Sequence, residues 1–194
     1  MKAYIIAATL IFSFSFSIFG QDPVKLTKIS SPPEIDGILD EAIWQELKPY
    51  SGFKTFIPDF GKPMPEKTEA WMTYDEENLY FAFKCYDSEP DKIVASIRNR
   101  DDLRNEDWVC MNLDTQNDQQ VITALYVNPY GIQMDARYAA GKEDPSADFV
   151  WYSAGKMDEQ GYTIEVKIPL KSVRFSDKEP VEMGVILERK ISRM

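Results

Sequence analysis

Histidine is absent from the chain, cysteine occurs only twice, and basic residues are outnumbered by acidic ones. Without histidine there is no Ser-His-Asp or Cys-His catalytic arrangement, no imidazole zinc ligand and no histidine general base. Cys85 and Cys110 alone are too few for a structural zinc site. The 22 Lys and Arg against 32 Asp and Glu give a net charge of -10, and binding of nucleic acid needs a basic surface. The composition therefore excludes most histidine-based enzymes and argues against a nucleic-acid partner.

The first residues have the pattern of an export signal rather than of a folded domain. Lys2 is their only charge, an apolar run interrupted by Thr and Ser covers residues 3–19, and Gly20 precedes a polar segment. This order predicts a signal peptide over residues 1–20. An uncleaved membrane anchor is the alternative, although the serines weaken the run as a span of about 20 residues. The mature domain, residues 21–194, would have 194 - 20 = 174 residues and, without Lys2, a charge of 21 - 32 = -11.

Apolar and polar residues alternate through most of the remaining chain, which is typical of half-buried strands. We predict strands over residues 68–74, 79–86, 108–114, 121–128, 131–137, 162–168 and 181–190. Turn-forming Asp, Asn, Gly and Pro residues separate them. Many short strands with this spacing indicate one all-β domain, an antiparallel, jelly-roll-like β-sandwich.

One short N-terminal helix is predicted over residues 41–47, with Asp40 as its N-cap. Ile43, Trp44 and Leu47 are spaced to lie on one face of this helix and to close one edge of a core. We interpret Trp44 as a core residue rather than as a surface for a sugar.

The two cysteines lie in segments that alternate in opposite phase. Cys85 shares a face with Phe81 and Phe83, which indicates the core, whereas Cys110 lies opposite Val109 in the alternation. One inward and one outward cysteine make a disulfide difficult to form, so we expect two free thiols.

Several motifs, in order, resemble the family 9 carbohydrate-binding domains. They are Ile35-Asp36-Gly37-x-Leu39-Asp40-Glu41-Ala42-Ile43-Trp44, the segment 71–81, Asp107-Trp108-Val109-Cys110-Met111-Asn112-Leu113-Asp114, Tyr126-Val127-Asn128, and the segment 161–169. The resemblance covers about residues 33–190. It implies a non-catalytic domain that binds a poly- or oligosaccharide.

A second set of motifs is similar to one bacterial group within this family. The set comprises Val127-Asn128-Pro129-x-Gly131-x-Gln133 and the segments 85–88 and 98–102. In that group the domain is the N-terminal part of a longer exported protein, followed by a β-rich region associated with the outer membrane. The resemblance implies that this chain is truncated at its C-terminus or is a fragment. It also implies a periplasmic, outer-membrane-associated or secreted location, and a downstream β-domain or the outer membrane as partner.

Four residues form the candidate sugar site. If Val109, Leu125 and Leu187 point into the core, the alternation turns four other residues of the same strands outward: Trp108, Tyr126, Asn128 and Glu188. If their strands are adjacent, as in the family's fold, these side chains combine an aromatic surface for a pyranose with groups that bond hydroxyls.

The site also departs from the family pattern. The stacking Trp that precedes this strand in sugar-binding members is replaced by the segment 103–106, and Cys110 and Tyr126 stand where members have Glu and Arg. Only Asn128 is retained. The alternative is therefore an interaction domain that has lost sugar binding and packs against a downstream β-region.

The chain shows no recognisable catalytic residues. A glycosidase needs two carboxylates that face each other across a cleft, and no motif places such a pair. We expect no cofactor and no catalytic metal. Acidic residues cluster at 101–107 and 114–118; a solvated acidic surface is the default interpretation, and a structural calcium ion is the alternative. Trp151 and Tyr152 follow an acidic loop, and either pack against the adjoining strand or form a second surface for a sugar.

Overall fold

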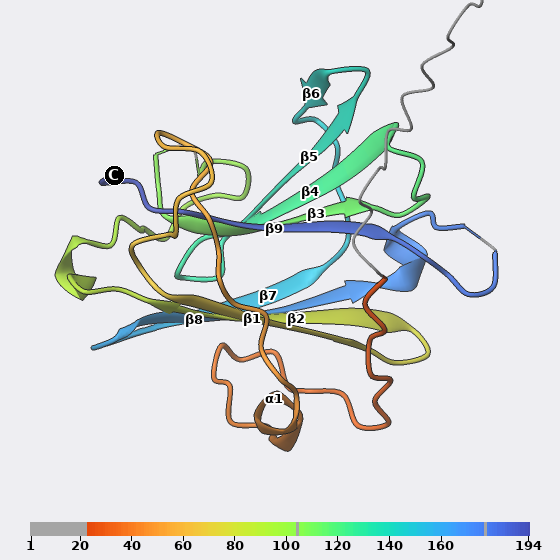
Figure 1. Cartoon of the computed structure of the whole chain (residues 1–194), viewed down its shortest axis with the longest axis horizontal. Coiled ribbons are helices and arrows are strands. Elements are labelled where there is room, and N and C mark those ends of the chain that lie inside the picture. The colour runs from red at the N-terminus through yellow and green to blue at the C-terminus, as the bar shows by residue number, and fades with distance from the viewer. Residues whose placement is uncertain (1–22, 104, 177) are drawn as a thin grey trace, which may run out of the picture.

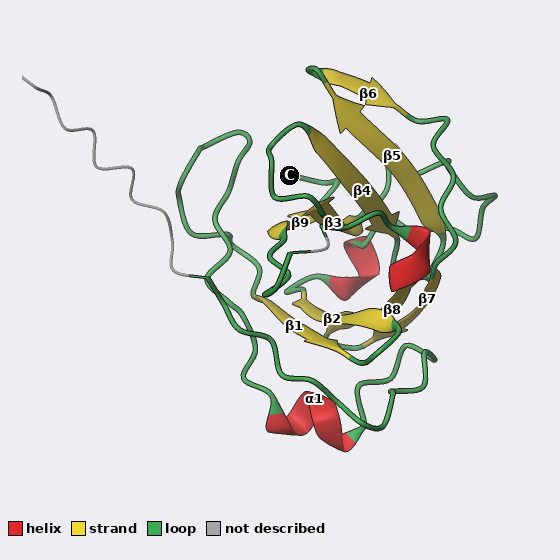
Figure 2. Cartoon of the chain, turned by 90° about the vertical axis from the view of Figure 1, so that its right-hand side faces the viewer, coloured by secondary structure: helices red, strands yellow, loops and turns green. Residues whose placement is uncertain are grey.

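The computed structural model describes residues 23–103, 105–176 and 178–194, and the predicted signal peptide lies outside this part. Two antiparallel sheets pack face to face (Figures 1 and 2). The strands are β1 (Thr68–Tyr74), β2 (Asn78–Tyr86), β3 (Trp108–Asp114), β4 (Val121–Val127), β5 (Gln133–Ala139), β6 (Lys142–Asp144), β7 (Tyr152–Asp158), β8 (Gly161–Pro169) and β9 (Gly184–Lys190). The four-stranded sheet has the order β1-β2-β8-β7, and the five-stranded sheet has the order β6-β5-β4-β3-β9. The predicted antiparallel β-sandwich is confirmed.

Helix contributes little to the described residues: α1 (Ala42–Glu46) and two 3-10 turns, η1 (Pro90–Lys92) and η2 (Leu170–Ser172). Figure 1 shows α1 below the four-stranded sheet, on the side away from the five-stranded sheet. No helix in the described part of the chain has the length and apolar character needed to cross a membrane.

The main core lies between the sheets and takes one residue in two from the long strands. From β3 and β4 it takes Val109, Met111, Leu113, Leu125 and Val127, all between 0% and 1% exposed. The alternation predicted for these strands is therefore confirmed. Cys85 belongs to this core, whereas Cys110 lies on the opposite side of β3, and both are free thiols as expected.

Two strands were missed because their sequences lack an alternating pattern. β6 has only three residues, all exposed. β7 contains Gly155, and two loops approach it closely at Gly37 and Gly131. A Cβ built on either of these two loop glycines would lie 2.9 Å from the Gly155 backbone. Because a small residue is needed at position 155, β7 lacks the alternation of apolar and polar residues that usually identifies a strand.

The helix forms, but Asp40 does not cap it. Glu41 occupies the N-cap position and makes no side-chain capping bond. Its Oε1 instead accepts a hydrogen bond from the backbone N–H of Glu34 at 2.9 Å, so the carboxylate turns back toward the preceding loop. The predicted cap was wrong because the helix begins at Ala42, one residue later than predicted, which leaves Asp40 one residue outside the N-cap position.

The N-terminal segment covers the outer face of the four-stranded sheet. Trp44 is 2% exposed and packs there with Trp71, Tyr80 and Ala82. Glu165 on β8 lies beneath this segment with 0% exposure. Trp44 is therefore a core residue, as interpreted, in a small second core.

The Glu165 carboxylate holds the N-terminal segment on the sheet. It accepts hydrogen bonds from Trp44 Nε1 at 2.8 Å, from the backbone N–H of Gly37 at 2.9 Å and from that of Asp36 at 3.2 Å. Burial raises the pKa of Glu165 from 4.5 to about 7, and the charge of nearby Glu41 acts in the same direction, while the three hydrogen bonds oppose it. The buried carboxyl is therefore protonated over a wider pH range than an exposed glutamate.

We predict that this group makes stability depend on pH. Because the pKa of Glu165 is raised on folding, the native state binds the extra proton between about pH 4.5 and 7, so its stabilising contribution is complete below pH 4.5 and is lost as the pH rises through 7. The change is on the order of 1–3 kcal/mol. Urea unfolding of the wild type and of Glu165→Gln at pH 5 and pH 8.5 isolates this contribution from the other carboxylates. Equal pH dependence in the two proteins would show that Glu165 does not titrate in this way.

Candidate functional site

The outer face of the five-stranded sheet brings the predicted site residues to neighbouring strands. Cys110 at the centre of β3 pairs with Tyr126 on β4 and with Glu188 on β9. Trp108 lies two residues before Cys110 on the same face and pairs with Lys190. The predicted adjacency of the three strands is thus confirmed, and the predicted residues supply two aromatic rings and a carboxylate to this face.

Trp108 and Tyr126 have different exposure. Their ring centroids lie 5.0 Å apart with an interplanar angle of 83°, an edge-to-face contact. Trp108 is half-buried, but Tyr126 is only 7% exposed. The Tyr126 hydroxyl lies 3.1 Å from that of Tyr138, and burial raises its pKa. Tyr126 therefore supports Trp108 from the side and does not present a free ring face of its own.

Contrary to the prediction, Asn128 does not face outward to solvent. It is 0% exposed, and its Nδ2 donates to the Ser96 carbonyl at 2.9 Å and to Glu106 Oε2 at 2.7 Å. Its Oδ1 accepts from the backbone N–H groups of Tyr130 at 3.0 Å and Ile132 at 2.9 Å. The predicted direct contact with a sugar is corrected: Asn128 ties the turn after β4 to the segment that precedes β3.

We predict a structural effect for Asn128→Ala. The substitution leaves the buried Glu106 carboxylate and two backbone N–H groups without this partner, which costs about 1–3 kcal/mol of unfolding free energy. Urea unfolding measures the loss, and faster hydrogen exchange at the Ile132 amide would locate it. Asn112→Ala, at a half-buried position on the same face, is the control. A stability loss no larger than that of the control would contradict the anchoring role.

The segment before β3 lies over part of the outer face. Leu103, 0% exposed, packs there with Cys110, Ala124 and Ala136. Burial, with a smaller contribution from the Glu188 charge, raises the pKa of the Cys110 thiol. The thiol therefore stays protonated and unreactive, and the open part of the face is the part around Trp108 and Glu188.

Tyr138 is a member of this face that the sequence analysis missed. The predicted strand ended at residue 137, but β5 continues to Ala139, and Met134, Ala136 and Tyr138 point to the outer face together. Extending the period-two pattern from Met134 by one more step would have found it.

Glu188 is exposed and stands beside Cys110 in the register. A carboxylate of this kind accepts hydrogen bonds from hydroxyl groups, and an indole face packs against the C–H groups of a pyranose. The arrangement suits recognition of a ligand by stacking and hydrogen bonding.

The acidic clusters have protein partners. Asp114 accepts from the backbone N–H of Gln119 at 2.7 Å, and Asp107 accepts from that of Ser192 at 2.9 Å. Glu106 bonds Ser96 and Asn128. Within the described residues, no group of three or more Cys, Asp and Glu side chains could hold a metal ion. The calcium alternative stays a prediction without an assigned set of ligands.

Trp151 and Tyr152 separate into a core residue and a surface residue. Trp151 is 3% exposed and belongs to the main core, so packing was the better of the two interpretations for it. Tyr152, the first residue of β7, is 49% exposed.

Comparison with known proteins finds one family and a small set of related folds. The model of the carbohydrate family 9 binding domain-like family matches residues 35–189. A family 9 carbohydrate-binding module from Caldicellulosiruptor kristjanssonii, solved in complex with glucose, is 19% identical with a TM-score of 0.57, over 84% of this chain and 76% of that chain. Its complex with cellotriose has the same TM-score of 0.57 at 18% identity, over 84% and 75%.

A protein from Bacteroides uniformis, described as a proposed carbohydrate-binding protein, has a TM-score of 0.67 at 10% identity, over 89% of this chain and 85% of that chain. No curated protein matches the sequence. At these identities the solved structures establish the fold alone.

Proposed function

Because the chain belongs to the carbohydrate family 9 binding domain-like family, we propose that it is a non-catalytic domain that binds oligo- or polysaccharides. The observation that carries the proposal is the half-exposed Trp108, in edge-to-face contact with Tyr126, on the same outer face of β3, β4 and β9 as the exposed Glu188. The complexes of the Caldicellulosiruptor module with glucose and cellotriose support neutral gluco-oligosaccharides as the first ligands to test.

In the proposed complex, a pyranose ring stacks on the Trp108 indole and its hydroxyl groups donate to Glu188. Tyr126 keeps the indole in place, and Asn128 holds the segment that borders the site. Each stacked aromatic residue that becomes desolvated is an anchor for binding, while the surrounding contacts add less.

We also propose that the protein is exported, with residues 1–20 as a removable signal peptide and a periplasmic, outer-membrane-associated or secreted location. The order of charged, apolar and small residues supports this. A link to polysaccharide breakdown in the same pathway or polypeptide is part of the same proposal.

The experiment is a titration of the protein against a glycan array, followed by calorimetry with glucose, cellotriose and longer oligosaccharides. We expect saturable binding that strengthens from the monosaccharide to the trisaccharide, because a longer ligand covers more of the sheet face. Absence of binding to every glycan would contradict the proposal.

One observation favours a second function, docking on a downstream β-rich domain or on the outer membrane. Phe56, Ile57 and Phe60 are 74%, 79% and 81% exposed at the tip of one loop, and the two phenylalanine rings lie 5.9 Å apart, edge to face. Large apolar side chains gathered on a surface commonly mark an interaction site. A protein that binds no glycan would support this function over the first.

A further inference from the structure

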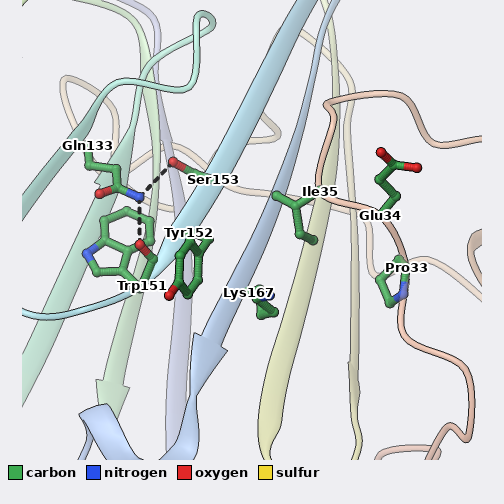
Figure 3. A pocket seen from close by; sticks show the side chains of 8 residues that line it. All are labelled: Pro33, Glu34, Ile35, Gln133, Trp151, Tyr152, Ser153 and Lys167. Carbon is green, nitrogen blue, oxygen red and sulfur yellow. Dashed lines mark hydrogen bonds between the residues drawn. The ribbon is translucent and has the colours of Figure 1, made fainter.

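A pocket of about 480 Å³ lies beside β7, away from the Trp108 face. It is formed where the N-terminal loop at residues 33–35 meets Tyr152 on β7 and Lys167 on β8 (Figure 3). Its volume is within the range of small-molecule sites, about 300–1,000 Å³. The pocket is thus large enough to bind a small ligand at a site separate from the Trp108 face.

Hydrogen bonds between distant segments hold one wall of the pocket in place. Gln133 Nε2 donates to the Trp151 carbonyl at 3.2 Å and to Ser153 Oγ at 3.0 Å, and Figure 3 shows both bonds. Ser153 Oγ donates in turn to the Gly131 carbonyl at 2.9 Å, and Arg100 donates to Gln133 Oε1 at 2.9 Å. Because this wall is already bonded, a ligand would meet a formed site rather than order a loose one.

The chemistry of the pocket combines one cation with an aromatic and an aliphatic surface. Lys167 Nζ lies 4.6 Å from the centroid of the exposed Tyr152 ring, and Ile35 and Pro33 line the opposite side. No carboxylate of the described residues lies within 4.0 Å of Lys167 Nζ. The ammonium group of Lys84, by contrast, pairs with the Asp158 carboxylate at 2.5 Å.

The other charged group at the pocket is oriented away from the cation. Glu34 also lines the pocket, but in Figure 3 its carboxylate points away from Tyr152 and Lys167. The ammonium group is therefore available to an anion, and its contact with the ring keeps it at the pocket.

We propose that this pocket binds an acidic sugar, a uronic acid residue of an oligosaccharide. The uronate carboxylate pairs with the Lys167 ammonium, and the C–H groups of the pyranose lie against Tyr152, Ile35 and Pro33. A charge-assisted hydrogen bond to a carboxylate is about twice as strong as a neutral one, so the pocket favours a uronate over a neutral sugar. This site does not depend on the Trp108 face and would exist even if that face bound nothing.

The test is a titration of the ¹⁵N-labelled full chain with trigalacturonate and, in parallel, with cellotriose. We expect trigalacturonate to shift the Trp151 indole and the backbone amides of Tyr152 and Lys167 in a saturable way, and to bind more weakly as salt is added. Lys167→Met keeps the aliphatic part of the side chain and removes its charge, and we expect binding to weaken by more than about tenfold. Lys156→Met, on the same face of β7 outside the pocket, is the matched control and should bind as the wild type does.

Three results would overturn the assignment. They are the absence of a saturable shift around Tyr152, equal occupancy of the pocket by cellotriose, and unchanged trigalacturonate binding by Lys167→Met. Trp108→Ala separates the two sites: it should leave trigalacturonate binding at the pocket unchanged, so failure at one site is distinguishable from failure at the other. A thermal melt of each variant shows that it is folded.

Discussion

Trp108→Ala should weaken binding of a neutral gluco-oligosaccharide by more than about tenfold. The indole is partly exposed on the outer sheet face, and it lies one alternation step along β3 from Cys110, which pairs with the exposed Glu188. Aromatic anchors at binding surfaces contribute about 2 kcal/mol or more, and 1.4 kcal/mol corresponds to a factor of ten. Calorimetric titration of wild type and variant with cellotriose measures the change.

Two further variants make this result specific. Trp108→Phe keeps a smaller ring and should have intermediate affinity. Phe60→Ala removes an aromatic ring that is 81% exposed and does not belong to the Trp108 cluster, and should bind as the wild type does. Equal affinity of Trp108→Ala and wild type, with both proteins folded, would remove Trp108 from the site.

Trp44→Ala should lower the free energy of unfolding by about 3–5 kcal/mol, the range for loss of a buried Trp or Phe side chain. Trp44 is 2% exposed between α1 and the outer face of the four-stranded sheet. Its removal leaves a cavity against Trp71 and Tyr80 and takes a donor from the buried Glu165 carboxyl. Urea unfolding at a fixed pH gives the value directly.

The two contributions of Trp44 can be separated. Trp44→Phe retains much of the packing but not the 2.8 Å hydrogen bond to Glu165, so its loss should fall between wild type and alanine. Glu46→Ala, at an exposed position of the same helix, should change stability little. A loss below about 1 kcal/mol for Trp44→Ala would show that the N-terminal segment is not a stabilising cover, since core deletions of this size cost several times more.

The strands of the core could be predicted because each buries one face. Val109, Met111 and Leu113 alternate with more polar neighbours, and that period identified both β3 and its orientation. The edge strands β6 and β7 could not be predicted, because neither has an alternation of apolar and polar residues. All residues of β6 are exposed, and β7 needs the small residue Gly155 where two loops approach it.

The candidate site was predicted only in part, because the alternation pattern describes a strand and not the segments that pack on it. Alternation tells which side of a sheet Asn128 and Tyr126 occupy, but it does not tell what covers that side. The Leu103 segment and Tyr138 come from elsewhere in the chain and bury Tyr126 to 7% exposure and Asn128 completely. Burial by distant segments is a property of the tertiary structure, and no local pattern encodes it.

The pocket beside β7 could not be found in the sequence at all. Pro33, Gln133, Tyr152 and Lys167 are distant in the chain, and only the packing of the N-terminal loop against β7 and β8 brings them together. The sequence allowed the same two interpretations for Trp151 and Tyr152, packing or a surface for a sugar, and the structure places Trp151 in the core and Tyr152 on the surface.

The most direct measurement uses the four tryptophans of the chain as separate reporters. In a ¹⁵N spectrum each indole N–H gives its own resonance; Trp44 and Trp71 report on the N-terminal cover, Trp151 on the β7 pocket and Trp108 on the outer face. Titration with cellotriose should move the Trp108 indole resonance in a saturable way and leave the other three in place. A Trp108 resonance that does not move while binding is measured by calorimetry would contradict the account, because the sugar would then lie elsewhere on the protein.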